Sequence, residues 1–272
     1  MLRNMRTPLL AAVLGFSLVG CFVGDASTPA GGDDDDGQGS NPPPTGSDSP
    51  TARVDVSVDH ATVNTELKTA NPIVVTVQGS GGFSGAVNLA ATVVDANGAT
   101  IPGWTVALSS PSVTLSADGM ATSMATVTIP PMSTALTGTL KVTSTSSATL
   151  GTAAATSALT ATNQLTFTVK VDPATGKCVY PADAGNLANP VTIALGTKVR
   201  FFNNGTANLE VHSSNNPVIS HQGQDPNGKA DLVTEANTAY EQTAAAKGNV
   251  TWYCHAPPSD LGAAADPRIV VQ

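Results

Sequence analysis

The sequence predicts an all-β chain of two β-sandwich domains, and three observations indicate it. Apolar and polar residues alternate with a period of two in many short runs, which are separated by Gly-, Pro- and Asn-containing turns. Only 12% of the 272 residues are charged, against about 25% in an average globular domain, and the Lys, Glu and Arg that favour long surface helices are scarce. At about 100–200 residues per domain, the length accommodates two domains.

Residues 1–20 have the pattern of a signal peptide. Arg3 and Arg6 precede an apolar run that ends at Val19, and the run is too short to span a bilayer as a mature helix. The segment Leu18-Val19-Gly20-Cys21 resembles the lipobox of bacterial lipoproteins, in which cleavage leaves a lipid-bearing cysteine. The resemblance implies a lipid anchor on Cys21 that holds the protein to the bacterial cell envelope, at the outer membrane, the periplasmic face or the cell surface. The alternative is an ordinary secretory signal with Cys21 as a free thiol.

Residues 21–50 are expected to form a disordered tether behind the lipidated cysteine. They contain four consecutive aspartates, Asp33–Asp36, and three consecutive prolines, Pro42–Pro44, with almost no large apolar side chains. Such a segment buries too little surface to offset its chain entropy. We therefore expect a solvated spacer between the membrane and the folded domains.

Residues 51–162 are predicted to form the first sandwich. Short alternating runs recur, and Asn97-Gly98 between two of them is a tight-turn signal. The stretch from Val75 to Leu89, with Gly79 and Gly82 within it, resembles the opening of bacterial immunoglobulin-like repeats. That resemblance implies a spacer or interaction domain. His60 has no partner residues with the spacing of an acyl-transfer site, and it is predicted to lie on the surface.

Charge and spacing restrict the classes of function. The formal net charge is −8, and the twelve Lys and Arg are spread thinly along the chain, so nucleic-acid binding is not expected. No nucleophile–base pair or pair of carboxylates has the spacing of a catalytic site, so we predict that the protein is not an enzyme.

Residues 163–272 are predicted to form the second sandwich. Alternating runs begin at Leu165, Val191 and Val250, and a strand is expected to stop at Asn203-Asn204-Gly205. The run from Val191 to Phe201 and the segment Trp252-Tyr253-Cys254 resemble the corresponding strands of cupredoxins, the blue copper protein family. The resemblance implies a Greek-key sandwich over residues 163–272.

The same resemblance implies a copper site. Blue copper needs two imidazoles and one thiolate. His212 and Cys254 fall where one imidazole and the thiolate would be, and the second imidazole would be His221 or His255. On this hypothesis the domain carries electrons to a redox partner or holds copper.

A disulfide between Cys178 and Cys254 is the competing hypothesis. Once Cys21 is acylated, these two thiols remain, and an even pair in an exported domain favours a disulfide. The bridge would remove the thiolate that type 1 copper requires. The protein would then be a metal-free, disulfide-stabilised interaction or structural module with a cell-surface partner.

Overall fold

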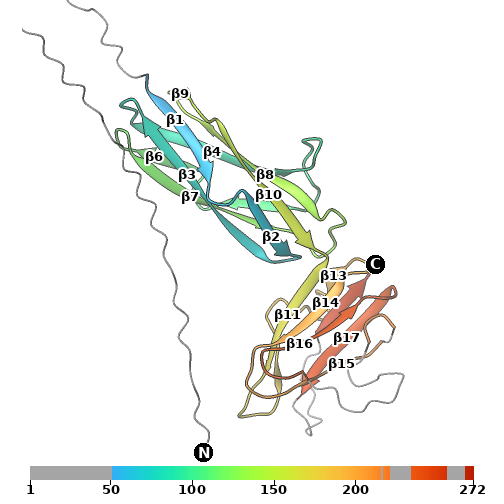
Figure 1. Cartoon of the computed structure of the whole chain (residues 1–272). Coiled ribbons are helices and arrows are strands. Elements are labelled where there is room, and N and C mark those ends of the chain that lie inside the picture. Colours follow the sequence, from blue (N-terminus) through green and yellow to red (C-terminus); the bar gives the residue numbers. More distant parts are fainter. Residues whose placement is uncertain (1–50, 216, 221–233, 256–266) are drawn as a thin grey trace, which may run out of the picture. The chain divides into compact units, whose positions relative to one another are not determined.

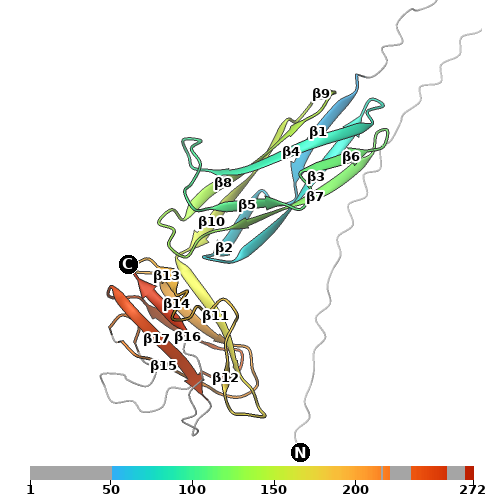
Figure 2. The same cartoon turned by 180° about the vertical axis from the view of Figure 1, so that it is seen from behind.

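The structure is a computed structural model that describes residues 51–215, 217–220, 234–255 and 267–272, without the side chain of His255. Every regular element in these ranges is a β-strand, and the strands form four sheets (Figures 1 and 2). The predicted all-β class is therefore confirmed. Within the described ranges, no helix is long and apolar enough to cross a membrane.

The first sandwich is built from ten strands. They are β1 (Arg53–Val58), β2 (Thr62–Glu66), β3 (Ala70–Ser80), β4 (Gly85–Val94), β5 (Thr105–Leu108), β6 (Ser112–Leu115), β7 (Met120–Thr128), β8 (Thr137–Thr145), β9 (Thr149–Leu150) and β10 (Ala154–Thr162). One sheet has the order β5-β7-β3-β1-β9, and the other has the order β2-β10-β8-β4-β6.

Two pairs of consecutive strands are divided between the two sheets. Strand β1 pairs with β3, whereas the next strand, β2, pairs with β10 of the opposite sheet. In the same way β5 pairs with β7, whereas β6 pairs with β4 of the opposite sheet. Because these four strands are short, neither sheet presents a long open edge where they lie.

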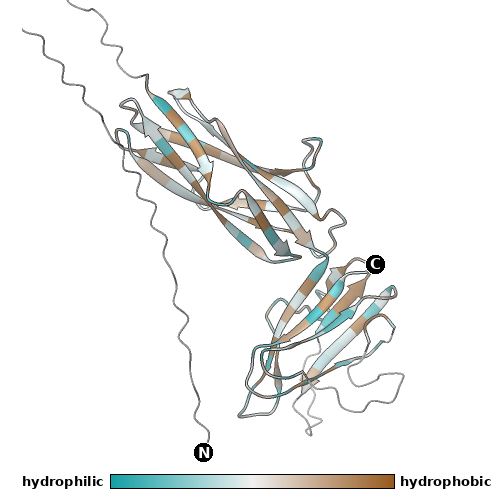
Figure 3. Cartoon of the chain, viewed as in Figure 1, coloured by the Kyte–Doolittle hydropathy of each residue, from teal (hydrophilic) through white to brown (hydrophobic). Residues whose placement is uncertain are grey.

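Hydrophobic and hydrophilic residues alternate along the strands of the first sandwich (Figure 3), and the buried hydrophobic ones build its core. On β3, for example, Ile73, Val75 and Val77 are fully buried. Trp104 is also buried, and its indole N–H donates a 2.8 Å hydrogen bond to the Ser133 hydroxyl. The alternation of apolar residues predicted the buried face of β3, because a strand directs every second side chain to the same face.

The Asn97-Gly98 pair forms the turn that the sequence predicts. Gly98 has φ of +82°, a left-handed value that residues with a Cβ rarely adopt. Its N–H donates a 3.0 Å hydrogen bond to the Asp95 carbonyl, and the Asp95 N–H donates to the Ala99 carbonyl at 2.8 Å.

The second sandwich is built from eight strands. They are β11 (Gln164–Val171), β12 (Cys178–Val179), β13 (Val191–Ile193), β14 (Lys198–Asn203), β15 (Glu210–Ser213), β16 (Ala239–Thr243), β17 (Gly248–His255) and β18 (Arg268–Val271). One sheet has the order β12-β11-β14-β16, and the other has the order β13-β18-β17-β15. The pairs β11–β14 and β13–β18 are parallel.

Asn203 ends strand β14 at the position that the sequence predicts. Its side chain is completely buried, and its amide group donates to the carbonyls of Ala207, at 2.9 Å, and Thr234, at 3.0 Å. Its amide oxygen accepts a 3.0 Å hydrogen bond from the Gly205 N–H. Because a buried amide is costly without partners, these bonds fix the turn that follows β14.

Candidate functional site

A buried disulfide joins the two sheets of the second sandwich. Cys178 of β12 is bonded to Cys254 of β17, with 5.4 Å between their Cα atoms, which is within the ordinary range. Cys178 is 7% exposed and Cys254 is fully buried. The predicted pairing is confirmed, and Cys254 has no free thiolate to offer a type 1 copper ion.

Trp252 is the centre of an aromatic cluster beside this disulfide. Its ring centroid lies 4.6 Å from that of Phe201, 5.3 Å from that of Phe167 and 5.2 Å from that of Tyr180. The Tyr180 hydroxyl accepts a 3.3 Å hydrogen bond from the Cys254 backbone N–H. Residues two apart on a strand share a face, so β17 presents both Trp252 and Cys254 to the core.

His212 lies on the face of the β15–β17 pair opposite to Cys254. In the antiparallel register Val211 faces Cys254, whereas His212 faces Tyr253, and successive residues of a strand point to opposite faces. The imidazole stacks on the Tyr253 ring, and its Nε2 atom lies 3.5 Å from Oε1 of Glu210. The structure therefore separates two residues that were expected to bind one metal ion.

The remaining expected ligands are not brought together by the described residues. His221 and Cys21 lie outside the described ranges, and His255 is described only by its register opposite Glu210. His60 is exposed, as predicted, with its Nδ1 atom 2.9 Å from Oδ1 of Asp59. Among the described residues, no three His, Cys, Asp or Glu side chains form a group that could hold a metal ion.

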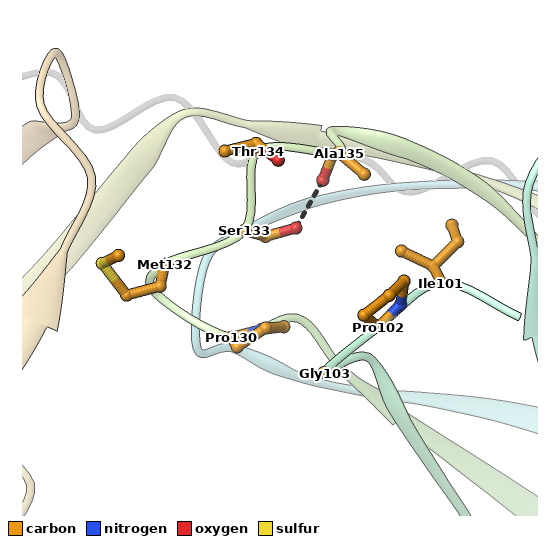
Figure 4. Close-up of a pocket in the computed structure, with 8 residues that line it drawn as sticks. All are labelled: Ile101, Pro102, Gly103, Pro130, Met132, Ser133, Thr134 and Ala135. Atoms are coloured by element: carbon orange, nitrogen blue, oxygen red, sulfur yellow. Dashed lines mark hydrogen bonds between the residues drawn. The ribbon is translucent and has the colours of Figure 1, made fainter.

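A pocket of about 460 Å³ lies in the first sandwich, between the β4–β5 and β7–β8 loops (Figure 4). Its lining is mostly apolar and consists of Ile101, Pro102, Gly103, Pro130, Met132, Ser133, Thr134 and Ala135. The Ser133 hydroxyl accepts from Trp104 and donates a 2.7 Å hydrogen bond to the Ala135 carbonyl. This hydroxyl already serves the fold, so it is a poor candidate for a catalytic nucleophile.

The outer face of the β12-β11-β14-β16 sheet gathers charged side chains of both signs, which the sequence analysis missed. We call it the charged face. It is defined by five outward residues of β11 and β14 and by Glu241 of β16: Thr168, Lys170, Lys198, Arg200, Phe202 and Glu241. The Glu66 carboxylate lies against the same face and accepts hydrogen bonds from Gln164 and Thr166. The signal was the alternation along β14, where Lys198, Arg200 and Phe202 point away from the buried Val199 and Phe201. The small number of basic residues in the whole chain concealed this local grouping.

Comparisons with known proteins return solved structures of immunoglobulin-like domains. No family model and no curated protein matches the sequence. Domains 4 and 5 of the S-layer protein SbsC are 18% identical, with a TM-score of 0.27, and the match covers 39% of this chain and half of that structure. The E. coli chaperone DraB is 11% identical, with a TM-score of 0.29 and coverage of 74% and 91%. The Salmonella enterica SafA pilin in complex with the SafB chaperone is 12% identical, with a TM-score of 0.26 and coverage of 72% and 88%.

These findings correct the cupredoxin prediction for residues 163–272. The Cys254 sulfur is bonded to Cys178, and His212 lies on the opposite face of the sheet, so the expected ligand set is not formed. No family model supports a copper domain. The aromatic-Cys segment and the Asn-rich turn misled the sequence reading, because they serve the packing of Trp252 and the turn at Asn203 instead of a metal.

Proposed function

We propose that this chain is an exported, lipid-anchored envelope protein whose two sandwiches act as a disulfide-stabilised interaction or structural module. The buried Cys178–Cys254 bond carries the proposal. Disulfides of this kind form and persist in oxidising compartments, and small-residue β-sandwiches serve there as spacers and binding modules. The signal-peptide pattern and the Leu18–Cys21 segment supply the route of export and the anchor.

The proposal does not include copper. The Cys254 sulfur is bonded to Cys178, and His212 lies on the other face of the sheet. It does not include catalysis either, because the pocket in Figure 4 is lined mainly by apolar groups and its Ser133 hydroxyl is already occupied. An exposed, stable pair of sandwiches at the end of a tether suits recognition or spacing.

Fractionation of bacteria that express the full chain tests the anchor. We expect the wild-type protein in the membrane fraction and the Cys21→Ala variant in the soluble periplasmic or secreted fraction. Ser27→Ala, a change in the same tether, should behave as wild type. Identical partitioning of the wild type and Cys21→Ala would contradict the anchor, and a protein retained in the cytoplasm with reduced Cys178 and Cys254 would contradict export.

A further inference from the structure

We propose that Met120 and Met124 of β7 are reversible oxidation sites that react with a hydroperoxide without loss of the fold, an inference that rests on the proposed envelope location. After the signal peptide the chain has three methionines, and the third is Met132 in the β7–β8 loop. Their exposed fractions are 66% for Met120, 44% for Met124 and 37% for Met132. Methionine is among the residues most often buried in proteins, so the exposure of all three sets this sandwich apart.

Strand β7 holds Met120 and Met124 on its outer face, away from the core. Both are exposed, whereas Ser123 and Ala125, on either side of Met124, are buried on the inner face. The Met124 backbone is held independently of its thioether: its N–H donates to the Ser109 hydroxyl at 2.9 Å, and its carbonyl accepts from the Ser109 N–H at 2.8 Å. Conversion of either thioether to the polar sulfoxide therefore removes no core contact and no backbone hydrogen bond.

The other readily oxidised side chains of the two sandwiches are withdrawn from solvent. The sequence has two tryptophans, Trp104 and Trp252, and both are buried. Cys178 and Cys254 are already joined in the buried disulfide. Oxidation is therefore directed to thioethers whose change leaves the packing intact, and away from the groups that build the cores.

The reaction balances with the hydroperoxide as the co-reactant. With hydrogen peroxide, a lone pair of the thioether sulfur attacks one oxygen, so that an S–O bond forms and the O–O bond breaks. The sulfur is oxidised by two electrons, and the leaving oxygen, which is reduced, takes the proton of the transferred oxygen and departs as water. The product is a methionine sulfoxide, which methionine sulfoxide reductases convert back to the thioether.

Treatment with hydrogen peroxide tests this inference on the full chain with Cys21→Ala and Met132→Leu, recovered from the soluble periplasmic or secreted fraction. Met132→Leu leaves the two residues of β7 as the only methionines after the signal peptide. Peptide mapping by mass spectrometry measures the sulfoxides, and urea denaturation measures the stability. We expect oxidation of both residues, faster at Met120, with an unchanged unfolding midpoint. The two reductases, one for each sulfoxide epimer, should restore both thioethers in the folded chain.

Leu140→Met in the same background is the matched control, because it places the same thioether at a fully buried position of β8 with little change in volume. In the folded chain, oxidation at that position should be slower than at Met120 by about tenfold or more, since it requires opening of the core. Met120→Leu with Met124→Leu should abolish the consumption of peroxide that the parent chain shows.

Three results would overturn the inference. They are equal oxidation rates at Met120 and at the position changed by Leu140→Met, a lower unfolding midpoint after oxidation of the parent chain, and sulfoxides that the reductases cannot repair without unfolding. If the wild-type chain is membrane-anchored and its disulfide is intact but one of these results is obtained, only this inference fails and the proposed function stands.

Discussion

His212 stacks on Tyr253 across the β15–β17 pair, with ring centroids 4.7 Å apart and ring planes 11° apart. Because Tyr253 and Cys254 are successive residues of one strand, this contact places the imidazole on the outer face while the Cys254 sulfur is buried on the inner face. The pleat of β17 thus keeps apart a histidine and a cysteine whose sequence positions predicted a shared metal ion.

The first prediction concerns the spectrum after addition of Cu(II). We expect no intense visible absorption of the blue copper type, because that band requires a copper-bound cysteine thiolate and Cys254 is bridged. Titration of the mature chain with Cu(II), followed by visible spectroscopy, checks this. An intense band that disappears in Cys254→Ser would show that the account of this site is wrong.

The second prediction concerns the stability that the disulfide supplies. The bond closes a segment of 76 residues, so its removal should lower the free energy of unfolding by about 2–4 kcal/mol. Cys178→Ala with Cys254→Ala, compared with the parent chain by urea denaturation, measures the loss. Dithiothreitol should destabilise the parent and leave the double variant unchanged. A parent chain whose unfolding midpoint does not respond to reductant would contradict this prediction.

The third prediction concerns a close approach at Gly138 of β8. A Cβ atom at this position would lie 2.8 Å from Cδ1 of Ile101 and 3.2 Å from Cζ3 of Trp104. Gly138→Ala should therefore lower the free energy of unfolding by about 1–3 kcal/mol through overpacking. Ile101→Val removes the crowding methyl group and should recover part of that loss in the Gly138→Ala background. Strictly additive effects in a double-mutant cycle would count against the crowding.

The fourth prediction concerns the alkaline titration of Tyr240. Burial raises the pKa of its hydroxyl to about 12, and the hydroxyl donates a 3.0 Å hydrogen bond to the Ser220 carbonyl. An unfolded tyrosine loses its proton at about pH 10, before the folded one does. Stability from this group is therefore complete below about pH 10 and falls as the pH rises toward 12.

Absorbance at the tyrosinate band, recorded against pH, checks the Tyr240 prediction. Tyr240→Phe should remove a step centred at about pH 12 and reduce the decline in stability above about pH 10. Titration of all three tyrosines in one step near the ordinary value, before any unfolding, would contradict it.

Local patterns in the sequence were enough to predict the sandwiches. The alternation of Ile73, Val75 and Val77 gave a buried strand face, and Asn97-Gly98 gave a turn with a left-handed glycine. Such features depend only on residues that are close in the chain. The structure contains them because every second side chain of a strand lies on the same face. The pairing of Cys178 with Cys254 was one of two open hypotheses at the sequence level, and it rested on the count of thiols in an exported domain.

Features that depend on which strands become neighbours were not predicted. The faces of His212 and Cys254 are set by the register of β15 on β17. The charged face depends on β11 and β14 lying side by side, which places Lys170 and Arg200 on one surface of the sheet. Sequence spacing alone carries no information on either relationship, so the metal site was expected and the charged face was missed.

Mass spectrometry of alkylated protein tests the central claim most directly. The full chain with Cys21→Ala is recovered from the soluble periplasmic or secreted fraction, denatured and treated with iodoacetamide, with and without prior reduction. We predict no alkylation without reductant, two alkylated residues after reduction, and a disulfide-linked peptide pair that contains Cys178 and Cys254. Two alkylated cysteines without reductant, in protein from that fraction, would contradict the disulfide-stabilised module and reopen the question of what Cys254 binds.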